Sequence, residues 1–99
     1  MASRSFVTSM GVTTSAVVRP NSAIYYGYTL RAGGSGAVVT IYDNASAASG
    51  TILDVVTIPA NGTANAYYSV EDCYGGVRAV NGVYFSTDNA VTGSIRVGE

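Results

Sequence analysis

The sequence VVTIYDNASAASGTILDVVTI, residues 38–58, decides the fold class of this chain. Its first five residues place Val39 and Ile41 on one side and Val38, Thr40 and Tyr42 on the other, as in a half-buried β-strand. Residues 43–50 are Asp, Asn, Gly and small side chains, which favour an exposed loop. Residues 51–58 are apolar on both faces, so one face can line a core while the other meets a second layer or a neighbouring subunit.

The same alternation extends in both directions from this stretch. Turn residues punctuate it, among them Pro59 to Gly62 and the pair Asn81-Gly82. The strands predicted between them are residues 10–18, 24–31, 38–42, 51–58, 64–70, 77–80, 83–87 and 94–97. We expect a hairpin-like connection at the glycine-rich residues 33–36 and a tight hairpin turn at 81–82.

About eight short strands without any helical 3.6-residue period predict two packed antiparallel sheets. We therefore expect an all-β protein, an antiparallel β-sandwich of jelly-roll type. An immunoglobulin-like sandwich is the alternative, because strand count does not separate the two. A chain of 99 residues accommodates one domain, which we place at residues 10–99. Residues 1–9 precede the regular pattern and form either an N-terminal arm that docks onto a neighbour or a disordered tail.

The composition indicates strands and a surface made for contact. Val, Ile and Thr together make 29 of the 99 residues, and such β-branched side chains suit pleated sheets. Only 11% of the chain is charged, with five Arg and no Lys, His or Gln. Tyr and Arg are favoured in protein contacts, whereas Lys is depleted there. We therefore expect a structural subunit whose surface is partly covered by other protein chains.

The same composition argues against most chemistry. Without His or Lys, and with one cysteine, the chain lacks the partners for Ser-His, Cys-His and lysine-based catalysis, so we expect no enzyme and no cofactor. Cys73 cannot form an internal disulfide, and without His it cannot complete a zinc site. The net charge of −1 and the scattered arginines do not favour nucleic-acid binding. No apolar stretch approaches the length of a membrane span, and we see no secretory signal at the N-terminus.

Aromatic and arginine side chains are the candidates for contact. The adjacent pairs Tyr25-Tyr26 and Tyr67-Tyr68 place one ring on each face of a strand, so one of each pair points outward. Such rings suit cores and subunit contacts, and they also suit stacking on sugars. Asp54 interrupts an apolar strand, either as a charge that protects a sheet edge or as an ion-pair partner of an arginine. The residues that we expect to contact other subunits are Phe6, Arg19, Tyr25, Tyr67 and Tyr84.

Residues 39–53, together with 82–87 and 93–97, resemble the small β-sandwich virion proteins of tailed bacteriophages. The likeness covers residues 24–97 and consists of strand, small-residue loop and strand, so no binding residue is carried over from the family. It implies a capsid decoration, or cement, protein that is made in the host cytoplasm and sits as a homotrimer on the head shell. There it would bind the major capsid protein and bridge neighbouring subunits. A tail or fibre component and a carbohydrate-binding module are the alternatives.

Overall fold

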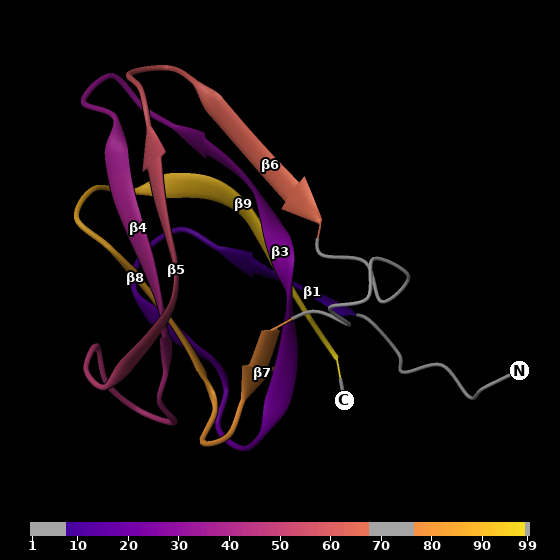
Figure 1. Ribbon diagram of the computed structural model, residues 1–99. Coiled ribbons are helices and arrows are strands. Elements are labelled where there is room, and N and C mark those ends of the chain that lie inside the picture. Colours follow the sequence, from indigo (N-terminus) through magenta and orange to yellow (C-terminus); the bar gives the residue numbers. More distant parts are fainter. Residues whose placement is uncertain (1–7, 68–76, 99) are drawn as a thin grey trace, which may run out of the picture.

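Nine strands make up the part of the chain that the computed structural model describes, residues 8–67 and 77–98 (Figure 1). Phe6 and Cys73 lie outside these residues. The strands are β1 (Thr8–Val12), β2 (Ala16–Arg19), β3 (Ala23–Ala32), β4 (Ala37–Asp43), β5 (Thr51–Ile58), β6 (Thr63–Tyr67), β7 (Val77–Ala79), β8 (Val83–Thr87) and β9 (Val91–Gly98). The first of them begins two residues before the boundary that we expected between arm and domain.

The strands form two antiparallel sheets that face each other. Sheet A has the order β1-β9-β3-β6, and sheet B has the order β2-β8-β4-β5. Strands β6 and β7 pair with different parts of the same edge of β3, and β9 pairs with the other edge of β3. The prediction of an all-β, antiparallel β-sandwich is confirmed.

The strand order also decides between the two sandwich topologies. An immunoglobulin-like sandwich places consecutive strands side by side in one sheet. Within the described residues, β4 and β5 are the consecutive strands that pair with each other, whereas β1 pairs with β9 and β2 pairs with β8. If β6 and β7 are counted as one strand position beside β3, each sheet has four positions. The strands of the two sheets interleave along the chain, which is the jelly-roll arrangement.

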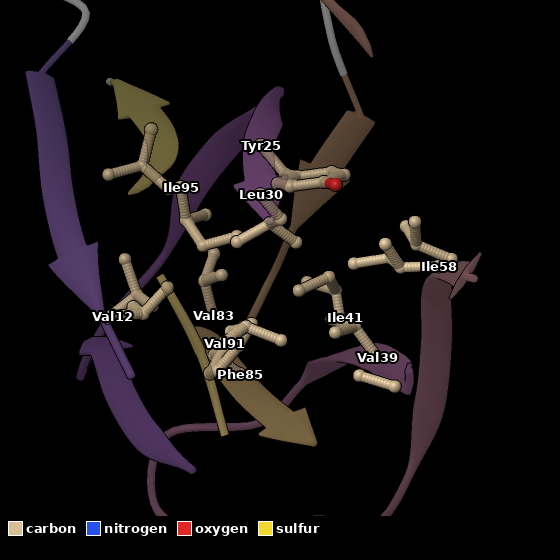
Figure 2. Packing of buried hydrophobic residues seen from close by; sticks show 14 of the residues in the cluster. Val12, Tyr25, Leu30, Val39, Ile41, Ile58, Val83, Phe85, Val91 and Ile95 are labelled. Atoms are coloured by element: carbon tan, nitrogen blue, oxygen red, sulfur yellow. The ribbon is translucent and has the colours of Figure 1, made fainter. Parts of the chain in front are cut away.

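The core lies between the sheets and consists of the inward side chains of both (Figure 2). Val39 and Ile41 of β4 meet Phe85 of β8 within sheet B, and Leu30 and Ile95 contribute from sheet A. All five are at most 1% exposed. Burial of one such side chain contributes about 1.5–3 kcal/mol, so these inward side chains favour the packing of the two sheets.

Residues 10–18, predicted as one strand, form parts of two strands in different sheets. Strand β1 ends at Val12, and the chain bends through residues 13–15 before β2 begins. Two hydrogen bonds hold the bend, since Val91 N–H donates to the Thr13 carbonyl and Thr87 N–H donates to the Ser15 hydroxyl. The bend residues 13–15 are Thr, Thr and Ser, without the Gly or Pro that marks turns elsewhere, which explains why the sequence shows no break.

The two expected hairpins are corners between the sheets. The turn at 33–36 joins β3 of sheet A to β4 of sheet B, and Asn81-Gly82 joins β7 to β8. Gly36 requires a positive φ of 69°, and a Cβ there would lie 2.8 Å from the Ile58 carbonyl oxygen. Turn residues predict that the chain reverses direction. They do not show whether the next strand joins the same sheet, as in a hairpin, or the other sheet, as in a corner.

Tyr25 and Tyr26 are both buried. The register of β3 against β9 shifts between Tyr25 and Gly27, which indicates a β-bulge at Tyr26. Tyr25 belongs to the core cluster with no exposed surface, whereas Tyr26 lies outside that cluster yet is 1% exposed. The outward ring of this pair is therefore not available to solvent, contrary to our expectation.

Candidate interaction surface

The side of sheet B that faces away from the core is largely apolar, and Asp88 borders it beside Val38, whose N–H donates to the Asp88 carboxylate. Its register aligns side chains in transverse rows, of which the first, Val17, Tyr84, Tyr42 and Ile52, crosses all four strands. We call this surface the outer face of sheet B. It consists of Val17, Val38, Thr40, Tyr42, Ile52, Val55, Thr57, Tyr84 and Ser86.

Three of these side chains are exposed to a degree unusual for their size. Val38 is 42% exposed, Ile52 52% and Val55 54%, and among the described residues one other large apolar side chain, Val80, is exposed as well. The cause is the sequence of β5, in which Val56 and Ile58 fill the core while Ile52 and Val55 point the other way. The alternation in residues 51–58 placed Ile52 with Val56 and Ile58, and Val55 with Leu53. The register shift at Leu53 instead brings Ile52 and Val55 to the same exposed face, where they can meet another protein.

The free edge beside this face is protected against strand pairing. Strand β5 is an edge strand with a register shift opposite Ile41 and Tyr42, which leaves Leu53 as the extra residue. Asp54 points inward and its Oδ2 accepts a 2.9 Å hydrogen bond from the Tyr25 hydroxyl. An inward charge and a bulge are two features that prevent a strand from joining another sheet, which agrees with the edge role expected for Asp54.

Asp54 also influences a neighbouring tyrosine. Burial, and secondly the negative charge of Asp54, raise the pKa of Tyr28 above its ordinary value. Both effects disfavour the phenolate, because a buried anion beside a carboxylate loses solvation and is repelled.

Asp43, at the end of β4, holds the corner between β7 and β8. Its carboxylate accepts hydrogen bonds from the N–H groups of Val80, Asn81 and Gly82, at 3.0, 2.7 and 3.3 Å. Burial opposes ionisation of this carboxyl, but the three donors outweigh it and lower the pKa of Asp43 below its ordinary value. This acid therefore has a structural role.

The loop between β4 and β5 is exposed, as expected, and is ordered by Asn44. The Asn44 side chain accepts from Ser46 N–H and Ala47 N–H and donates to the Ser49 carbonyl. Asp88 and Asn89 act similarly at the end of β8, where they bind the backbone of Val38 and Gly36. These Asp and Asn side chains hold turns and connections, as Asx side chains commonly do.

The outer side of sheet A has a different character. It carries Arg31, Arg78 and Arg96 among Thr, Ser and Asn side chains. The Arg96 guanidinium donates to the Ala66 carbonyl, the Thr29 hydroxyl and the Asn65 side chain. This side of the sandwich is therefore polar and positively charged.

The expected contact residues are distributed over different environments. Tyr84 lies on the outer face of sheet B and is half-buried. Arg19, also half-buried, borders an open depression of about 320 Å³ that Arg78, Asn21, Ser22 and Ala23 complete. The expectation for Tyr25 is wrong, because this side chain has no exposed surface and binds Asp54 across the core.

Two further expected residues cannot be placed as contacts. Phe6 lies outside the described residues, and so does the side chain of Tyr67, whose backbone pairs with Gly27. The sequence did not single out Val38, Tyr42, Ile52 and Val55, which form much of the outer face of sheet B. The apolar character of both faces of residues 51–58 was a signal for Ile52 or Val55 alone, because alternation placed the two on opposite faces.

Within residues 8–67 and 77–98, no three acidic, His or Cys side chains lie close enough to hold a metal ion. No helix in this part of the chain has the length and apolarity to cross a membrane. Searches of family models, curated proteins and solved structures found no match to this chain.

Proposed function

We propose that this protein is a structural component of a virion, a capsid decoration protein that binds the outer head shell of a tailed bacteriophage and bridges its major capsid subunits. The observation that carries the proposal is the outer face of sheet B, where Val38, Ile52 and Val55 expose apolar surface on a small sandwich and the charge of Asp88 lies at the border beside Val38. Such a surface suits a partner protein and offers no groups for catalysis.

The fold supports the proposal by analogy. Jelly rolls occur in viral capsid domains, and they also occur in lectins and other proteins, so the fold alone does not define a function. A decoration protein needs a rigid body and a contact surface, because many copies on one shell turn a modest affinity for each site into strong retention. The charge-poor composition and the protected edge of β5 agree with this role.

A carbohydrate-binding module is the second candidate, since Tyr42 and Tyr84 are neighbours on the outer face of sheet B. A sugar site also needs hydrogen-bonding groups around the rings. The nearest acid and amide along the chain, Asp43 and Asn44, already bind backbone groups of the corner and the loop. The surroundings of the two rings therefore favour protein contact.

Co-sedimentation with empty head shells tests the proposal. The purified chain is mixed with shells of the phage whose genome carries its gene, and we expect it to appear in the pellet at a fixed ratio to the major capsid protein. Shells of an unrelated phage serve as the control. Absence from the matched shells, or binding to a glycan array in place of shells, would contradict the proposed function.

A further inference from the structure

We infer that the depression between the β2–β3 turn and strand β7 is a binding site for a phosphate group, either free or carried by a small ester. The described residues that line it are Arg19, Asn21, Ser22, Ala23 and Arg78, and its volume is about 320 Å³. None of these residues belongs to the outer face of sheet B, so the inference goes beyond the proposed function and does not depend on it.

Two arginines from different sheets border this depression. Arg19 ends β2 of sheet B, and Arg78 is the middle residue of β7, which pairs with β3 of sheet A. The corner between β7 and β8 lies beside the turn between β2 and β3 at the lower end of Figure 1, since Ala79 pairs with Ala23. The fold thus brings to one depression two positive charges that are far apart in the sequence.

The acidic side chains of the described residues are engaged elsewhere. Asp43 accepts hydrogen bonds from the backbone of the corner between β7 and β8. Asp54 is directed into the core toward Tyr25, and Asp88 binds the backbone at the start of β4. None of these three acids is among the described residues that line the depression. The described lining therefore carries positive charge that a bound anion would balance.

The polar side chains at the depression offer hydrogen-bond donors. Those of Asn21, Ser22 and Arg78 make no hydrogen bond or ion pair with another described residue. A guanidinium has five N–H donors, so the half-buried Arg19 can bind an anion beside any contact that it already makes. By contrast, the Arg96 guanidinium on the outer side of sheet A donates to three acceptors within the fold. The donors at the depression thus suit a ligand rich in acceptors.

Charge and geometry favour phosphate over a carboxylate as this ligand. A phosphate group carries a charge of about −1.5 to −2 at pH 7, which matches two guanidinium groups, whereas a carboxylate carries a single charge. Arginine also donates pairs of parallel hydrogen bonds to phosphate oxygens. The volume of about 320 Å³ is at the lower end for small-molecule sites, which leaves room for the small group that an ester adds.

NMR titration of the full chain at pH 7 and constant ionic strength tests the inference, with inorganic phosphate as the first probe. We expect the Nε–H signals of Arg19 and Arg78 to shift and to reach a plateau at millimolar phosphate, while the signal of Arg31 does not move. Glycerol 3-phosphate is the second probe. A plateau at lower concentration than with inorganic phosphate assigns the site to an ester, and a plateau at the same or a higher concentration assigns it to the free ion.

One variant and one matched control complete the test. Arg78→Gln should weaken phosphate binding about tenfold, because it removes charged donors from the depression at an exposed position. Arg31→Gln should leave the binding unchanged, because Arg31 is equally classed as exposed but borders a different depression, of about 350 Å³, that no other described charged residue lines. Circular dichroism shows whether each variant folds.

Four results would overturn the inference. They are signals of Arg19 and Arg78 that do not shift, shifts that never reach a plateau, acetate binding as tight as that of phosphate, and phosphate binding that Arg78→Gln retains. A loss of binding in Arg31→Gln as large as that in Arg78→Gln would also overturn it, because the response would then follow net charge and not this depression.

Discussion

The hydroxyl of Tyr25 in β3 donates a 2.9 Å hydrogen bond to Oδ2 of Asp54 in β5, and this bond links the two sheets across the core. Tyr25 has no exposed surface, and Asp54 lies on an edge strand with its carboxylate directed inward. The pair thus combines two tasks, since it satisfies a buried hydroxyl and keeps a charge on the inner side of an edge.

Replacement of Tyr25 by Phe should destabilise the fold by about 1–3 kcal/mol, because the partly buried Asp54 carboxylate then loses a donor. Urea unfolding followed by circular dichroism measures the change. Tyr84→Phe, on the half-exposed outer face, is the control and should change stability by less than about 0.5 kcal/mol. Equal stability of Tyr25→Phe and the unaltered chain would show that the hydrogen bond across the core contributes nothing to the free energy of unfolding.

Asp54→Asn should lower the pKa of Tyr28, since it removes the negative charge that disfavours the phenolate. The pKa should stay above 10.0, because burial is the larger cause and remains. Titration of Tyr labelled with ¹³C at Cζ, followed by NMR, resolves this residue. An unchanged Tyr28 pKa in the variant would contradict the proximity of the two groups.

Asp43→Asn should cost about 1–2 kcal/mol, because the ionised carboxylate accepts three backbone N–H groups at the corner between β7 and β8. Asp88→Asn is the matched control, since the Asp88 side chain accepts one such bond, from Val38, and it should cost less. Thermal unfolding at pH 7 compares the two.

The contribution of Asp43 should depend on pH in a defined direction. The pKa of Asp43 in the folded state is lowered from 3.8, so the unfolded state binds the proton at a higher pH than the folded state does. The stabilisation by Asp43 is therefore complete at pH values above 3.8. It is lost as the pH falls below 3.8 through the folded pKa, and the stabilities of Asp43→Asn and the unaltered chain should converge there. A difference that persists undiminished at pH 2 would contradict the role of the charge.

Gly93→Ala should prevent folding or cost more than about 3 kcal/mol. Gly93 has a φ of 153°, and a Cβ there would collide with the carbonyl oxygen of Thr29 on the adjacent strand. Gly11→Ala is the control, because a Cβ at Gly11 would have Gly93 O at 3.8 Å as its nearest neighbour. Tolerance of alanine at both sites in a urea titration would show that β3 and β9 are not packed as closely as the structure places them.

The sequence predicted the positions of the strands better than the connections between them. Alternation in residues 38–42 and 83–87 reflects burial on one side, which is a local property, and both strands occur where expected. Whether Asn81-Gly82 makes a hairpin or a corner depends on which sheet receives the next strand. The corner is also held by Asp43, which is distant in sequence and binds its backbone, so the local sequence does not show it.

The candidate surface was foreseeable in part. Simple alternation in residues 51–58 placed Ile52 and Val55 on opposite faces, so one of them was expected to be exposed. Both are exposed, because the register shift at Leu53 cannot be read from the alternation. Tyr25 was misassigned because a tyrosine suits a core and a contact surface equally, and its buried hydroxyl is satisfied by Asp54 from the other sheet. Such a partner cannot be read from either strand alone.

The position of β9 between β1 and β3 has a consequence for the biosynthesis of this protein. Neither β1 nor the long edge of β3 gains its neighbour until β9, which follows both by most of the described chain, has left the ribosome. Strand β2 waits in the same way for β8. Strands β4 and β5, and β3 and β6, can pair earlier, so β1 and β2 are the strands whose pairing comes last in translation.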